Sequence, residues 1–436
     1  MKTLIVNREN QVALLLGILW AYLTAIGGTW AGFAPEIARY SLIAVVVCAM
    51  LWLALHGSLG RQWQYTALDI PIVLWCLVFA VNALGNWEKI GWIGYGLWFA
   101  ALYIVVYFTL SAIIGFIGKE RAMIVFLVSG LPVLFSAMAS FGNSTGRLQG
   151  WLQNANLVGS FVGLWLPLVL GYRAFCVKSK PQQRGLLFLA AIMIGAIALF
   201  GSISRGAMIG LMIALLFSFI VSRERQYVIM MTIVLVVFCL LTTTVTRTGY
   251  PAAGDRKIGD TDRLRVYGHA LNTFAEHPII GNGLFTYRCC AFDAGDVSAY
   301  YHAHNATLHI AAELGIFGLA ALGATVIAVI YWAIQAWRRD ATPMRPLRLG
   351  SLMALIACAV HQFVDFTVMT PALALGLIWC IILATDTPSL TARRGRHQMA
   401  QSVVLLITWV LLLGVALYSL AKAPNGLTQL LVLPQP

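Results

Sequence analysis

The sequence predicts an all-α fold, a polytopic transmembrane helical bundle of roughly 12–13 spans. Of the 436 residues, 60% are hydrophobic and only 10% are charged, and the mean hydropathy is +0.83. Apolar runs of about 20 residues, long enough to cross a bilayer, recur along the whole chain. We therefore expect residues 1–436 to form a single integral membrane domain, with one long hydrophilic loop, 246–305, inserted between helices.

The apolar runs give the positions of the predicted helices. They lie at 11–30, 37–56, 69–86, 90–117, 122–142, 156–176, 186–203, 206–222, 227–245, 307–336, 349–368, 371–386 and 400–421. One helix over 186–221 would be about 54 Å long, whereas the hydrocarbon core is about 30 Å thick. The chain must therefore break within GSISRGA, where Gly201 and Gly206 flank polar residues. The 349–386 region is interrupted only near Pro371.

The basic residues predict the orientation of these helices. With a cytoplasmic N-terminus, most of the 29 Lys and Arg residues fall in cytoplasmic segments, as the positive-inside rule requires. The formal net charge of +13 then mostly records topology and does not indicate nucleic-acid binding. On this topology the 246–305 loop faces the outside of the membrane.

The long outer loop carries balanced charges, and its middle predicts an amphipathic helix. In DRLRVYGHALNTFAEHP the apolar residues recur at helical spacing, namely Leu264, Tyr267, Leu271 and Phe274, and Pro278 ends the pattern. Arg263 and Arg265 on this helix either belong to a solvated face or bind an anion. Arg288, later in the same loop, is a further candidate for substrate binding.

Two more arginines lie on the same outer side. Arg205 stands at the GSISRGA break, where its guanidinium would reach the membrane surface and could bind an anion through two parallel hydrogen bonds. The alternative is a structural arginine that snorkels to the surface. Arg147 lies between the spans at 122–142 and 156–176, and Asn156 is expected to cap the second of these.

Histidines gather where the long loop ends and the next span begins. In HAHNATLHIAAELG, Asn305 is the expected N-cap, and His309 and Glu313 recur at i and i+4 on one helix face, reaching inward from the helix mouth. His302 and His304 are expected to stay outside, at an exposed position. A histidine can take or give a proton near neutral pH, which suits activation of a hydroxyl group. The alternative role is packing at the membrane interface.

A second pair, His361 and Asp365, stands at i and i+4 in HQFVDF, near the outer end of the 349–368 span. Ionisable residues within a membrane are candidates for function, but such a pair can also lock helices together. We expect a structural or supporting role for both residues.

Together these stretches resemble the O-antigen ligase and polymerase superfamily of bacterial inner-membrane glycosyltransferases, and most closely the O-antigen ligases. The resemblance rests on GSISRGA at 201–207, the run from Arg265 to Gly283 with its P-x-x-G-N-G, HAHN-x-x-L followed by E-x-G-x-x-G at 302–318, and HQFVDF at 361–366. It covers mainly residues 140–375.

The resemblance implies a glycosyltransferase C-type architecture, a Gram-negative inner membrane and a periplasmic active site that needs no cofactor. Such enzymes take a glycan from undecaprenyl diphosphate and pass it to an acceptor, which for the ligase is lipid A-core. By resemblance His304 would be the catalytic base. The candidate substrate-binding residues are Arg205, Arg265, Arg147, Arg288, Asn305 and His302, and the candidate supporting residues are Glu313, His361 and Asp365.

Several alternatives stay open. An O-antigen polymerase would share the basic outer loops and the lipid carrier, and a protein O-oligosaccharyltransferase would usually carry a further soluble region after its last spans. A secondary transporter would have a similar number of helices and intramembrane His and Asp residues, but we see no repeat of two halves. Asp260 and Asp262 have a spacing by which some glycosyltransferases hold a divalent ion. Ion pairs with Arg263 and Arg265 offer an ordinary explanation that we favour, and the resemblance implies no metal.

Overall fold

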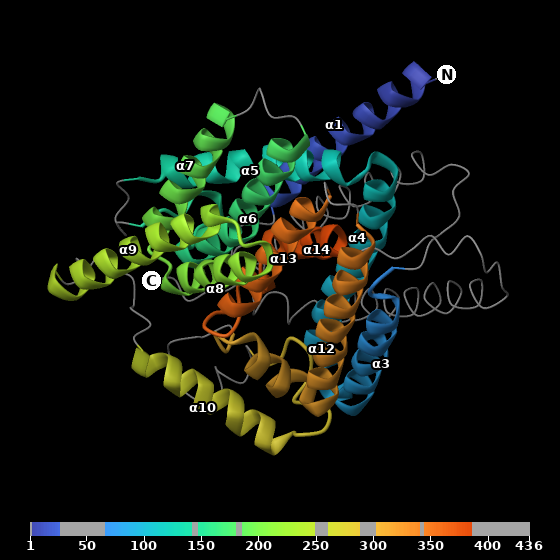
Figure 1. Ribbon diagram of the computed structural model, residues 1–436. Coiled ribbons are helices and arrows are strands. Elements are labelled where there is room, and N and C mark those ends of the chain that lie inside the picture. The colour runs from blue at the N-terminus through green and yellow to red at the C-terminus, as the bar shows by residue number, and fades with distance from the viewer. Residues whose placement is uncertain are drawn as a thin grey trace. The chain divides into compact units, whose positions relative to one another are not determined.

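The computed structural model describes residues 2–26, 66–141, 147–179, 185–248, 260–287, 302–340 and 344–385. All regular secondary structure in these ranges is helical and no strand occurs in them, which confirms the predicted all-α class (Figure 1). The chain divides into two compact units. Among the described residues, the first unit comprises 2–26, 109–141, 147–179, 185–248, 333–340 and 344–385, and the second comprises 66–108, 260–287 and 302–332.

Six segments among the described residues are helices long and apolar enough to cross a membrane, so this is a multi-pass membrane protein. They are Trp87–Ile117, which joins η2 (Trp87–Lys89) to α4 (Ile90–Ile117), then α5 (Lys119–Ala139), Ala155–Val177 in α6 (Ala155–Ser179), α7 (Gly185–Ser202), α8 (Arg205–Ser222) and α12 (Ala306–Arg339). Shorter apolar helices are α3 (Asp69–Gly85), Arg225–Leu240 in α9 (Arg225–Thr248) and α14 (Pro371–Ala384). The predicted spans at 37–56 and 400–421 lie outside the described residues.

The first unit is organised around α13 (Arg345–His361), which packs against both α6 and α8. Small residues let these three helices approach closely. A side chain on Gly171 of α6 would come within 2.7 Å of the Cα atom of Gly350 on α13, and one on Gly210 of α8 would collide with the carbonyl group of Ala357. In the same unit α1 (Lys2–Ile26) packs on α5 and α14.

Two helix boundaries in the first unit bear on the predicted site. The predicted break is confirmed, since α7 ends at Ser202 and α8 begins at Arg205, with Ile203 between them in a left-handed conformation (φ 50°). The predicted bounds of the 349–368 span are wrong. α13 begins earlier, because Pro346 fits a first helical turn that needs no backbone N–H donor, and it ends at His361, so that Asp365 follows the helix.

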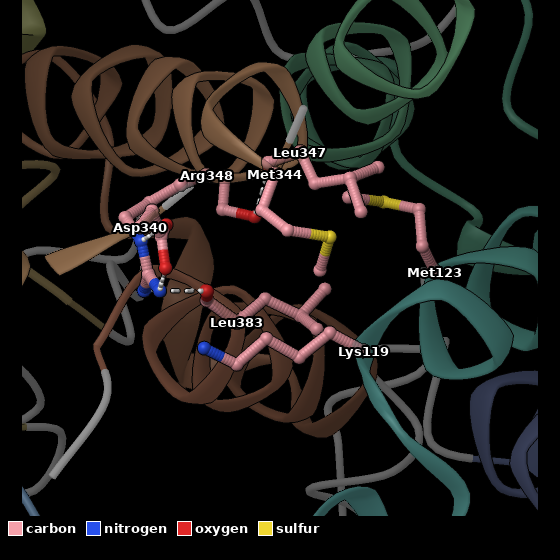
Figure 2. Close-up of a pocket in the computed structure, with 8 residues that line it drawn as sticks. Lys119, Met123, Asp340, Met344, Leu347, Arg348 and Leu383 are labelled. Atoms are coloured by element: carbon pink, nitrogen blue, oxygen red, sulfur yellow. Dashed lines mark hydrogen bonds and ion pairs between the residues drawn. The ribbon is translucent and has the colours of Figure 1, made fainter. Parts of the chain in front are cut away.

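At the start of α13 a buried arginine joins three segments. Arg348 is 3% exposed; it donates from Nη2 to Asp340 Oδ1 at 2.8 Å and from Nη1 to the carbonyl oxygen of Ala384 at 2.7 Å. Figure 2 shows it beside a small pocket that Lys119 and Met123 of α5 also line.

The second unit is held together at the turn 277–287, which follows α10 (Asp260–Glu276). Asn82 of α3 donates from Nδ2 to the carbonyl oxygens of Ile280 at 2.7 Å and Glu313 at 2.9 Å. Its Oδ1 accepts the backbone N–H of Leu284 at 2.8 Å. One asparagine side chain therefore ties α3 to this turn and to α12.

In α12 a kink replaces the single straight helix that the sequence predicts. Gly315 has φ 63° and ψ −156°, which separates residues 306–314 from the long segment 316–339. Only glycine fits at residue 315, because its φ lies in the left-handed region and because a Cβ atom would come within 2.7 Å of the Gly281 nitrogen. Ile316, just after the kink, donates its N–H to the carbonyl oxygen of Pro278 at 2.8 Å. The kink thus fixes the 277–287 turn against the start of the long segment.

The predicted amphipathic helix is confirmed as α10, but its buried face differs from the predicted one. Val266 and Ala270 are buried and pack with Tyr287, Ala303 and Ala312. Leu264 and Leu271, from the predicted apolar stripe, are 68% and 51% exposed. The small side chain of Ala270 permits close packing on the Val266 face of α10. The prediction was based on large apolar residues and therefore chose the other face.

Candidate functional site

The predicted site residues are distributed over both units. Among the described residues the first unit holds Arg147, Arg205, His361 and Asp365, and the second holds Arg265, His302, His304, Asn305 and Glu313. Arg288 lies outside the described residues, and so do the side chains of Asp260 and Asp262.

In the first unit Arg147 belongs to a polar network with Asn156 and Asp365. Arg147 donates from Nε to the carbonyl oxygen of Ser202 at 2.8 Å and from Nη2 to Asn156 Oδ1 at 3.0 Å. The Asn156 amide in turn donates from Nδ2 to Asp365 Oδ2 at 2.9 Å. Asp365 is only 5% exposed, so a neutral amide connects a buried carboxylate to an arginine. This arrangement fixes Arg147 beside the end of α7.

The expected capping role of Asn156 is wrong. Helix α6 begins at Ala155, so Asn156 lies within its first turn, and Asn154 Oδ1 instead accepts the N–H of Asn156 at 2.8 Å. Because Asn154 caps this helix start, the Asn156 side chain is available for Arg147 and Asp365.

Arg205 is exposed and is the first residue of α8, as the predicted break implies. Its guanidinium is therefore carried at the positive end of an 18-residue helix. A cation at a helix N-terminus is unfavourable for stability in itself, since the helix dipole favours negative charge there. The same combination suits the binding of an anion.

His361 is buried in the first unit at the end of α13. Its Nδ1 atom lies 2.7 Å from the hydroxyl oxygen of Ser160 on α6. Asn156 and Ser160 stand one turn apart on α6 and bond to Asp365 and His361, which are also four residues apart. The pair therefore joins the α13 end to α6, as expected for a supporting role.

In the second unit His302 and His304 lie in a tight turn before α12, and their predicted exposure is wrong. They are 3% and 7% exposed, and their ring centroids are 4.2 Å apart. His304 has φ 48°, a left-handed conformation that costs a non-glycine residue about 1–3 kcal/mol. Tyr267 of α10 donates its hydroxyl to the His304 carbonyl oxygen at 3.3 Å. The chain thus folds back on itself here, and the rings are covered.

Asn305 is confirmed as the N-cap of α12. Its Oδ1 accepts the N–H of Leu308 at 3.0 Å, and its carbonyl oxygen accepts the N–H of His309 at 3.0 Å. The cap fixes the helix start directly after His304. An asparagine engaged in this way has a structural role, whatever further contacts it makes with substrate.

Glu313 connects several parts of the second unit. Its carboxylate accepts the backbone N–H of Phe285 at 2.9 Å and of Tyr287 at 3.0 Å, and its Oε1 lies 3.4 Å from Nε2 of His309. The predicted i, i+4 pairing of His309 with Glu313 is confirmed. Both residues lie before the kink at Gly315, so they belong to the short segment of α12 and not to the long one.

Arg265 is exposed on α10, at a position next to the buried Val266. Nearby, Arg263 is half-buried, and its Nε atom has no hydrogen-bond partner among the described residues. The Arg263 side chain is thus partly covered, whereas the Arg265 side chain is exposed.

Polar residues within apolar spans were missed by the sequence analysis. Asn82 of α3 and Asn86, the residue that follows α3, both bond to the 277–287 turn, and Lys89 of η2 bonds to Asn282. Ser160 bonds to His361. The available signal was their spacing, since Asn82 and Asn86, like Asn156 and Ser160, stand at i and i+4 within an otherwise apolar predicted span.

Comparison with known proteins bears on residues 190–323, which match the family described as O-antigen ligase (Wzy_C). A comparison with curated protein sequences gives no match. The matched region contains Arg205, Arg265, His304 and Glu313, whereas Arg147 and the His361–Asp365 pair lie outside it. That family includes ligases, polymerases and O-oligosaccharyltransferases, which transfer lipid-linked glycans. The middle of this chain is thus similar to membrane glycan transferases of the O-antigen ligase family.

Proposed function

We propose that the chain is an O-antigen ligase that transfers a polysaccharide from undecaprenyl diphosphate to lipid A-core at the periplasmic face of a Gram-negative inner membrane. Two residues within the region that matches the O-antigen ligase family support this proposal. Residues 190–323 contain both an exposed arginine at a helix start, Arg205, and a histidine held in a left-handed turn, His304. A diphosphate needs a cation, and an acceptor hydroxyl needs a base.

The donor would be bound by Arg205 and Arg265. Both side chains are exposed, and a guanidinium can grip two phosphate oxygens through parallel hydrogen bonds. When the bond between the anomeric carbon and the phosphate oxygen breaks, the electron pair stays on the diphosphate. Cationic groups placed there stabilise that growing charge, and in this proposal arginine takes the part that a metal ion plays in other glycosyltransferases.

The acceptor would be activated by His304. A neutral imidazole takes the proton of the acceptor hydroxyl while the hydroxyl oxygen forms the new bond to the anomeric carbon. The hydrogen bond from Tyr267 and the Asn305 cap limit the positions of this residue's backbone. Such preorganisation favours the reacting geometry over others. The diphosphate leaves without a proton, so no separate acid is required.

A deletion strain distinguishes the members of the family. Loss of a ligase leaves rough lipopolysaccharide core on a gel while carrier-linked glycan accumulates, and the wild-type chain restores the ladder. Core that bears single repeat units would indicate a lost polymerase instead. Unchanged lipopolysaccharide together with lost protein glycosylation would indicate an O-oligosaccharyltransferase. Coupled flux of an ion and a solute, with no transfer, would indicate a transporter.

A further inference from the structure

A chain of hydrogen bonds in the first unit ends on His361. The Gln362 amide nitrogen lies 2.8 Å from the Thr367 hydroxyl oxygen, which lies 2.6 Å from that of Ser160, which lies 2.7 Å from Nδ1 of His361. Ser160, His361 and Thr367 are each at most 2% exposed. The chain joins α6, the end of α13 and η4 (Thr367–Met369).

Gln362 anchors one end of this chain. The N–H of Val368 donates to Gln362 Oε1 at 3.2 Å, which distinguishes the amide oxygen from the amide nitrogen. The nitrogen therefore donates to the Thr367 hydroxyl oxygen. Ser160 bonds both to Thr367 and to Nδ1 of His361, which fixes the orientation of the His361 ring.

The Nε2 edge of the His361 ring faces the first turn of α8. A Cβ atom on Gly206 would lie 3.0 Å from Nε2 and 2.7 Å from Cδ2 of that ring. The ring therefore lies directly against the backbone of the residue that follows Arg205. A side chain at Gly206 would clash with this ring and with Val364, whose Cγ2 atom would lie 2.5 Å from the new Cβ, so this glycine is needed for close approach and not for its φ angle.

We propose that Ser160, Thr367 and Gly206 are positioning residues for Arg205. The hydrogen-bond chain holds His361 in one orientation against the start of α8, and so fixes the backbone from which Arg205 reaches the carrier diphosphate. None of the three residues touches substrate. The inference rests on the proposed function, because it assigns these residues to the donor and not to the acceptor.

Thr367→Val tests the chain, because it removes the hydroxyl group at nearly constant size. Initial transfer rates would be measured on purified protein in lipid nanodiscs, with undecaprenyl-diphosphate-linked glycan and lipid A-core varied in turn. The KM for the glycan donor is expected to rise about five- to tenfold, because that factor corresponds to the free energy of one lost hydrogen bond. The KM for the acceptor should stay constant, and Thr367→Ser should restore the wild-type value. Gly206→Ala should raise the same donor KM.

A double variant separates this inference from the proposed function. If Thr367 acts through Arg205, then adding Thr367→Val to Arg205→Lys should change the donor KM little further. Three results would overturn the positioning role while the transfer reaction stands. The first is a donor KM in the double variant that equals the product of the two single effects. The others are an unchanged donor KM in both Thr367→Val and Gly206→Ala, or equal changes in the donor KM and the acceptor KM. Absence of transfer by the wild-type protein would instead overturn the proposed function itself.

Discussion

Glu313→Gln is expected to loosen the 277–287 turn while the helices stay folded. The carboxylate is 5% exposed, and each of its oxygens accepts one backbone N–H, from Phe285 at 2.9 Å and from Tyr287 at 3.0 Å. A glutamine keeps one acceptor oxygen but places an NH2 group against the other donor. One charge-assisted hydrogen bond, about 1.5–3 kcal/mol, is lost, which corresponds to roughly ten- to a hundredfold in the opening equilibrium.

Hydrogen exchange followed by mass spectrometry measures this opening directly. Exchange in peptides that cover residues 282–287 should rise roughly ten- to a hundredfold in Glu313→Gln, with peptides from the first unit unchanged. The matched control is Glu276→Gln, because Glu276 is exposed at the end of α10 and its loss should change nothing. Equal exchange in wild type and Glu313→Gln would refute the reasoning, and so would a uniform rise along the whole chain.

The remaining predictions concern the reaction and the kink. Transfer should persist in excess EDTA, because the proposed donor site neutralises the diphosphate with arginine; activity lost on chelation and restored by magnesium would contradict this. Arg205→Lys and Arg265→Lys should each lower the transfer rate roughly ten- to a hundredfold, since an ammonium keeps the charge but loses the paired hydrogen bonds; wild-type rates for both would remove the proposed donor site. Gly315→Ala should destabilise the protein by more than about 1 kcal/mol, because the new side chain meets backbone at φ 63°; an unchanged melting temperature would count against the kink.

Features that depend on local chemistry could be predicted from the sequence. The helix break before Arg205 follows from the length of an apolar run compared with the thickness of a bilayer, and α7 and α8 confirm it. The Asn305 cap and the His309–Glu313 pair follow from spacing along one helix, and both are present.

Features that depend on distant residues could not be predicted. Asn156 has the sequence of a cap, yet its partners are Arg147 and Asp365, the latter 209 residues away. The burial of His304 depends on a turn whose left-handed backbone no local rule requires of histidine. The kink at Gly315 reflects the close approach of Gly281, a contact between helix α12 and the 277–287 turn that apolar periodicity does not encode.

In the proposed reaction this chain passes a carrier-linked glycan to an acceptor hydroxyl with His304 as the base. The most direct measurement is transfer by purified protein in nanodiscs, with undecaprenyl-diphosphate-linked O-antigen and lipid A-core, for wild type, His304→Ala and the exposed control His277→Ala. Wild type and His277→Ala should form glycan-bearing lipid A-core, and His304→Ala should form none while it keeps the helical circular dichroism of the wild type. Product formed by His304→Ala at the wild-type rate, or none formed by the wild type, would contradict the claim.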